Sequence, residues 1–158
     1  MKKLLTTALL ATAAPTALLA DEVVVGGFYD IENDSRSLSL AYHSDPVWTL
    51  WNRTQIGWAV GTRFDDDQDF FVGAGISTQT ALSDRIYFSF RFMPGYYEAG
   101  RNGNPLGGPL SFWSEVGFGY RLTDSSALLL TYDHFSNAFI YDRNQGVDAF
   151  GLAYAYSF

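Results

Sequence analysis

The sequence predicts an all-β fold, namely an eight-stranded antiparallel transmembrane β-barrel. Bulky apolar residues alternate with small or polar ones at period two, in segments of about ten residues. The small face also carries charged residues, as the narrow polar interior of a barrel would. A soluble sandwich can show a similar alternation. The mixture of glycine, alanine and charge on one face favours the barrel.

The first four predicted strands are bounded by polar connections. Residues 22–31 and 36–43 are separated by an acidic cluster at 30–34, which is typical of a solvated loop. The third strand, 53–64, alternates Ile, Trp, Val, Thr and Phe with Gly, Ala, Gly and Arg. The fourth strand, 69–79, follows a second acidic run.

The other four strands show the two faces more clearly. Residues 85–97 alternate Ile and Phe with Tyr, Ser and Arg, and residues 109–122 alternate Leu, Phe, Val and Tyr with Ser, Trp, Glu, Gly and Arg. The seventh strand is 126–137. The eighth, 147–158, has large residues at its even positions from Phe150 onward and Val, Ala, Gly or Ser at its odd positions. We expect the large even positions to face lipid.

The connections differ in length in the way that outer-membrane barrels require. Residues 80–84 and 123–125 are short, whereas 98–108 and 138–146 are longer. If both termini are periplasmic, the long connections face outward, as expected. The connection at 44–52 is long for a periplasmic turn, and the sequence offers no reason for it.

The inward faces predict a charged network inside the barrel. We expect the interior to be a structural ion network rather than a pore or a catalytic set. Phe135 should pack inward, and His43 should be an interior hydrogen-bonding residue. The charged members of the network are Arg63, Arg91, Glu115, Arg121 and Asp133.

The N-terminal sequence predicts the cellular localisation of the protein. Residues 1–20 have a cationic start at Lys2 and Lys3, then an apolar, alanine-rich run, and are interpreted as a secretory signal peptide. The rest, 21–158, suits a single outer-membrane barrel domain. The chain has no cysteine and a formal charge of −7, which becomes −9 without Lys2 and Lys3. This acidity argues against nucleic acid as a partner.

A serine, a histidine and an acid are predicted to meet on the lipid-facing surface. His134 and Ser136 are two residues apart on one strand, so they share a face. In a hairpin of the last two strands, we expect Ser136 to lie opposite Asp148 and His134 to lie near Phe150. Polar groups facing hydrocarbon are costly and therefore suggest function.

These residue types suit nucleophilic catalysis. An imidazole can take the proton of a serine hydroxyl, and a carboxylate can fix the imidazole tautomer. Nearby donors must stabilise the oxyanion that develops. The nearby amides are Asn137 and Asn144.

The motif resembles that of PagL-type outer-membrane lipid A deacylases. The resemblance lies in His134-Phe-Ser-Asn-Ala138, in Asn144-Gln-Gly146 and in an acid twelve residues after the serine. It implies an eight-stranded barrel that hydrolyses the ester-linked 3-hydroxyacyl chain at the 3-position of lipid A, without a metal or another cofactor. It implies Ser136 as nucleophile, His134 as base and Asp148 in the place of the family's Glu. Asn144 matches the loop asparagine of the oxyanion hole.

Three residues depart from the family pattern. Asp148 is one methylene shorter than Glu, Gln145 replaces the loop proline, and Phe139 stands where a small residue is common. The first departure would lower activity, and the last would alter the acyl groove or the oxyanion geometry.

Two other functions stay open at this point. One is a non-catalytic structural or adhesive outer-membrane barrel, in which the three residues are accidental. The other is an acyltransferase, which needs an interior acyl cavity. The expected partners are lipopolysaccharide and the outer membrane, and a homodimer is an open alternative to a monomer.

Overall fold

The computed structural model describes residues 21–32 and 34–158, so the predicted signal peptide at 1–20 lies outside the described residues. Within this part of the chain, no helix is long and apolar enough to cross a membrane. The strands are β1 Glu22–Asp30, β2 Ser35–His43, β3 Trp48–Leu50, β4 Thr54–Asp65, β5 Phe70–Ala81, β6 Ile86–Glu98, β7 Leu110–Thr123, β8 Ser126–Ser136 and β9 Val147–Ser157.

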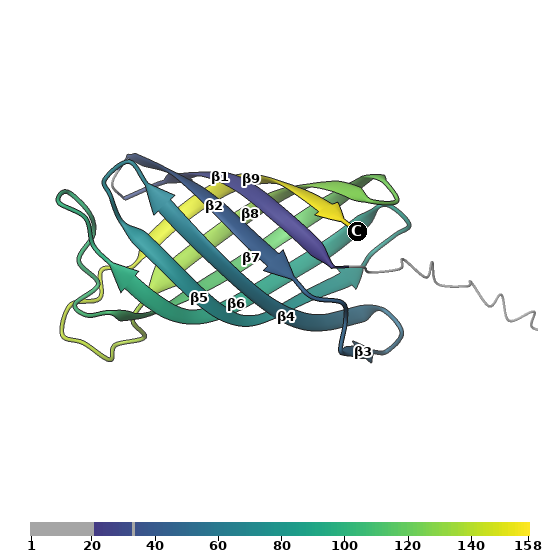
Figure 1. Ribbon diagram of the computed structural model, residues 1–158, viewed down its shortest axis with the longest axis horizontal. Helices are drawn as coiled ribbons and strands as arrows, with labels where there is room; N and C mark the ends of the chain where they lie inside the picture. Colours follow the sequence, from purple (N-terminus) through teal and green to yellow (C-terminus); the bar gives the residue numbers. More distant parts are fainter. Residues whose placement is uncertain (1–20, 33) are drawn as a thin grey trace, which may run out of the picture.

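Eight of these strands close into an antiparallel barrel (Figure 1). β1 pairs with β9 from Glu22↔Ser157 to Asp30↔Ala149. β2 pairs directly with β4, although the short β3 comes between them in the sequence. The predicted eight-stranded transmembrane barrel is therefore confirmed. The strand bounds differ from the predicted ones by at most two residues.

The strand β3 explains the long connection after β2. It pairs with the start of β4, from Trp48↔Ile56 to Leu50↔Thr54, and extends the barrel wall as a hairpin. The turn is closed by the Arg53 N–H, which donates to the Leu50 carbonyl at 3.1 Å. Trp51 and Asn52 have φ of 48° and 54°, as a primed two-residue hairpin turn requires.

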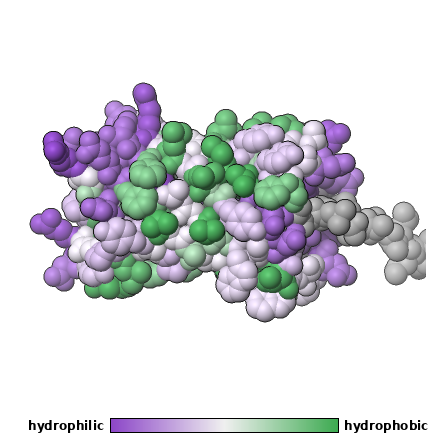
Figure 2. Space-filling view, viewed as in Figure 1, coloured by the Kyte–Doolittle hydropathy of each residue, from purple (hydrophilic) through white to green (hydrophobic). Residues whose placement is uncertain are grey.

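The outer face of the barrel is apolar around its middle. Figure 2 shows hydrophobic residues gathered there and hydrophilic residues gathered at both ends. Phe118, Leu130, Phe150 and Leu152 are all more than half exposed. The predicted outward direction of the even positions of β9 is therefore confirmed, and the surface suits hydrocarbon.

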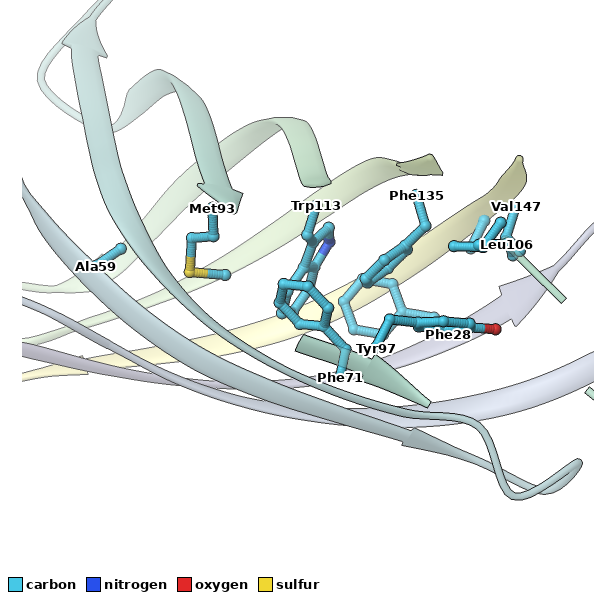
Figure 3. Packing of buried hydrophobic residues seen from close by; sticks show 10 residues of the cluster. Phe28, Ala59, Phe71, Met93, Tyr97, Leu106, Trp113, Phe135 and Val147 are labelled. Carbon is cyan, nitrogen blue, oxygen red and sulfur yellow. The ribbon is translucent and has the colours of Figure 1, made fainter. Parts of the chain in front are cut away.

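The barrel interior combines aromatic packing with charge. The rings of Trp113 and Phe135 stack at 5.2 Å between centroids, and Phe71 meets both edge-on (Figure 3). Phe135 is 3% exposed, so its predicted inward packing is confirmed. These rings fill the barrel interior close to the end where β8 terminates.

The predicted interior ion network is present. Arg63 binds both Asp30 and Asp133, and Arg91 binds Glu115 at 2.6 Å. His43 is also an interior residue, as predicted. Its Nδ1 lies 3.1 Å from Glu22, and its Nε2 lies 3.4 Å from Arg91.

Arg121 is the exception within this predicted network. It is only half-buried, and its guanidinium lies over the ring of Tyr87, 4.8 Å from the centroid, rather than against a carboxylate.

We expect Arg63→Ala to cost about 3–5 kcal/mol of unfolding free energy, because it leaves two buried carboxylates without their cation. Asp30 and Asp133 are 2% and 0% exposed, so bulk solvent does little to stabilise their charge once the guanidinium is gone. Urea unfolding in lipid vesicles measures the loss. The control is Arg121→Ala, which removes a half-buried arginine without an ion pair. Equal stability of the two variants would contradict a structural role for the network.

Candidate active site

His134 and Asp148 are direct cross-strand partners on the outer surface. β8 and β9 pair with His134 opposite Asp148, and the His134 Nδ1 lies 2.8 Å from the Asp148 Oδ1. The two side chains are 44% and 30% exposed. The carboxylate accepts a hydrogen bond from Nδ1–H, which leaves the lone pair of the imidazole Nε2 free.

The predicted register of this hairpin is wrong by two residues. Tyr132, and not His134, lies opposite Phe150. Ser136 lies beyond the β8–β9 pairing, which ends at Phe135↔Val147, and its partner is Phe112 on β7. The reason is that the chain turns away directly after Ser136, where the Ile140 N–H donates to the Asn137 carbonyl at 3.0 Å. The acid is therefore better placed for the histidine than the sequence indicated.

Ser136 is the last residue of β8 and is half-buried. It shares the outward face of the strand with His134, as the spacing predicts. Within residues 21–32 and 34–158, its hydroxyl has no hydrogen-bond partner. The hydroxyl is therefore available to a substrate or to the imidazole, whose catalytic hydrogen bonds often tighten only when substrate is bound.

The loop at 137–146 is held by asparagines. Asn137 is fully buried, and its Nδ2 donates to the carbonyls of Leu106 and Arg143. The backbone N–H of Asn137 donates to the Asn144 Oδ1 at 2.8 Å. The Asn104 Nδ2 donates to the Gly146 carbonyl at 2.8 Å. Two neighbouring loops are thus tied together beside Ser136.

Within the part of the chain that the structure describes, these bonds leave the buried Asn137 Oδ1 without a donor, and they leave the Asn144 amide nitrogen unused at the site. The Asn144 Oδ1 is occupied by the Asn137 N–H, so the side chain is oriented and its Nδ2 points elsewhere. Among the described residues, this Nδ2 has no acceptor. Asn144 can therefore donate to a bound group.

The turn after Ser136 has an uncommon backbone. Ala138 and Phe139 have φ of 51° and 61°, although neither is glycine. Such residues cost free energy and tend to occur at functional sites. The Phe139 side chain is 86% exposed. The turn therefore presents a phenyl ring at the same end of the barrel as Ser136.

The sequence did not point to two further partners of Asp148. The Tyr132 hydroxyl donates to Asp148 Oδ1 at 2.6 Å, and Glu32 Oε2 accepts the Asp148 N–H at 2.8 Å. Tyr132 could have been found, because it precedes His134 by two residues and shares its face. Glu32 comes from the distant β1–β2 connection, and no local pattern singles it out.

Comparison with known proteins identifies the family. The family described as Lipid A 3-O-deacylase (PagL) matches residues 35–157. The chain belongs to the PagL family. The matched range includes Ser136, His134 and Asp148.

One relative in this family is Lipid A deacylase PagL of Bordetella bronchiseptica (strain ATCC BAA-588 / NCTC 13252 / RB50). It is 29% identical over 112 residues, which is 71% of this chain and 51% of the relative. The chain thus matches about half the length of this PagL relative.

Solved structures support the PagL fold. The crystal structure of the outer membrane enzyme PagL has a TM-score of 0.66 at 16% identity, covering 87% of this chain and 99% of that one. A de novo designed transmembrane β-barrel has a TM-score of 0.60 at 12% identity, covering 88% and 95%. At these identities the likeness shows the fold alone.

Proposed function

We propose that this protein is a lipid A 3-O-deacylase, a serine esterase that acts in the outer leaflet of the Gram-negative outer membrane. Its substrate is the ester-linked 3-hydroxyacyl chain at the 3-position of lipid A. The observation that carries the proposal is the 2.8 Å contact between His134 and Asp148, with Ser136 on the same outward face. Membership of the PagL family supports the same reaction.

In the proposed mechanism, Ser136 Oγ attacks the ester carbonyl carbon and gives its proton to His134 Nε2. The tetrahedral intermediate collapses, the sugar oxygen leaves with the proton from Nε2, and the acyl chain stays on Ser136. Water then gives a proton to Nε2 and attacks this ester. The 3-hydroxy fatty acid leaves as Ser136 regains its proton. Asp148 holds the imidazole tautomer throughout.

The site location suits a lipid substrate. The three residues lie on the outer wall, where a lipid can reach them by lateral diffusion. A cavity beside Phe71, Phe135 and Val147 measures about 20 Å³, which is room for a water but not for an acyl chain. The larger hollows lie among the loops, and the barrel interior beside the site is filled by Trp113 and Phe135, which favours hydrolysis over the acyltransferase alternative.

The two asparagines receive different roles in this proposal. The free Nδ2 of Asn144 would donate to the oxyanion, as the resemblance implies. The Nδ2 of Asn137 is used by two loop carbonyls. We therefore assign Asn137 to holding the loop and orienting Asn144, rather than to direct contact with the oxyanion.

We expect Asn144→Ala to lower kcat by about 10²–10³, which is the usual cost of one oxyanion donor. KM should change little, because the hydrogen bond lost from Nδ2 forms only in the transition state, and the other bond lost, from the Asn137 N–H to Oδ1, lies within the loop. Turnover of purified lipid A in detergent measures both constants. Gln145→Ala is the control, since it changes an exposed neighbour in the same loop. An unchanged kcat for Asn144→Ala would move the oxyanion role to backbone amides.

Mass spectrometry of lipid A from cells that express the chain tests the function. Loss of one 3-hydroxyacyl group relative to cells with an empty vector is the expected result. An unchanged spectrum would favour the structural or adhesive barrel. Gain of an acyl chain would favour transfer.

A further inference from the structure

The Asp148 carboxylate has two donors on a single oxygen. Oδ1 accepts from His134 Nδ1 at 2.8 Å and from the Tyr132 hydroxyl at 2.6 Å. The sequence resemblance and the proposed mechanism account for the histidine only. The tyrosine therefore needs its own explanation.

Tyr132 reaches the carboxylate diagonally across the sheet. It lies opposite Phe150, the next outward residue after Asp148 on β9, and it shares the face of His134. Its ring packs against Phe150 at 5.4 Å between centroids. This contact holds the ring in place. The hydroxyl therefore approaches the Asp148 carboxylate along the outer wall, from the direction of Phe150.

The short, partly exposed side chain of Asp148 needs a second hydrogen bond to hold its carboxylate in place. Asp148 is 30% exposed, and the donors to its carboxylate are His134 and Tyr132, with the Glu32 side chain as a further neighbour. Without the tyrosine, the carboxylate could rotate toward solvent and leave the imidazole. A hydrogen bond from a hydroxyl to a carboxylate is short and strong, and it limits this rotation.

We propose that Tyr132 is a positioning residue, which holds the Asp148 carboxylate against His134 and divides the negative charge on Oδ1 between two donors. This inference rests on the proposed esterase function for its meaning. Tyr132 acts through Asp148 and does not touch the reacting atoms. The charged group next to this pair is Glu32, whose Oε2 binds the Asp148 N–H, while the β7 neighbour of His134 is the uncharged Ser114.

The kinetic test compares Tyr132→Phe with Tyr154→Phe. Tyr154 also faces outward, on β9, and its hydroxyl has no hydrogen-bond partner in the described part of the chain. We expect Tyr132→Phe to lower kcat on lipid A about tenfold with KM unchanged, since a hydrogen bond to a charged group is lost. The acid limb of the pH profile should move to higher pH, because the undivided charge on Oδ1 stabilises the imidazolium. Tyr154→Phe should change neither.

An unchanged kcat and pH profile for Tyr132→Phe would overturn the proposal. A lower kcat without movement of the acid limb would also overturn it, since that pattern indicates general loosening of the strand. The same loss in Tyr154→Phe would point to a general role of outward tyrosines.

A second readout does not depend on activity. The chain has two histidines, His43 and His134. Their ring signals can be titrated by NMR in detergent micelles, in a Ser136→Ala background. Adding Tyr132→Phe should move the titration midpoint of His134 to higher pH and leave the interior His43 unchanged. If wild-type protein releases no fatty acid yet His134 responds in this way, the proposed function fails and the positioning role stands. An unmoved His134 midpoint contradicts the positioning role whatever the activity.

Discussion

Ser136→Ala is expected to lower the turnover of lipid A by about 10⁶, the scale on which a nucleophile and its base act as a unit. The barrel should still assemble, because the residue is half-buried and its hydroxyl supports no other contact in the described residues. Release of fatty acid from purified lipid A measures turnover. The shift of folded barrel on an unheated gel measures assembly.

The control for this variant is Ser114→Ala. Ser114 is also half-buried, and it lies on β7 directly opposite His134, so it matches the surroundings without the proposed role. It should keep near wild-type turnover. Near wild-type turnover of Ser136→Ala itself would show that the nucleophile is wrongly assigned.

Asp148→Ala should lower kcat by about 10⁴, because a base in the wrong tautomer or orientation cannot accept the serine proton. The fold should be unaffected, since the side chain lies on the outer surface. Asp148→Glu should retain activity, because it restores the acid of the family pattern. Asp142→Ala serves as the control, as it removes an exposed acid from the neighbouring loop. The kcat of each variant on purified lipid A is the measurement.

A fully active Asp148→Ala would contradict the triad and leave either a dyad or another acid. A second carboxylate close to Asp148 should then be tested. Glu32 binds the backbone of Asp148 at 2.8 Å and is therefore the nearest substitute that these contacts provide. Loss of activity only in the double variant of Glu32 and Asp148 would assign the orienting role to both.

The barrel was predictable because its signal is repeated along the chain. Each strand buries one face and exposes the other, so period two recurs in every segment. The strand β3 was not predictable, because three residues carry no detectable period. Its turn also places Trp51 and Asn52 at positive φ, where glycine is the usual signal.

The candidate site was predictable only in part. Strand parity placed Ser136 and His134 on one face, but it could not fix the register between two strands. That register depends on where the chain turns, and the turn uses Ala138 and Phe139 at positive φ without a glycine signal. The hydrogen bonds of Asn137 could not be predicted from the sequence, for a different reason. Its acceptors are backbone carbonyls, one of them on the separate loop that carries Leu106.

We propose that Ser136 cleaves the ester at the 3-position of lipid A. The deciding experiment incubates purified wild-type protein and Ser136→Ala with lipid A in detergent and identifies the products by mass spectrometry. We expect wild-type protein to release one 3-hydroxy fatty acid per lipid A, from the 3-position, and Ser136→Ala to release none. Equal release by both proteins, or release from another position, would contradict it.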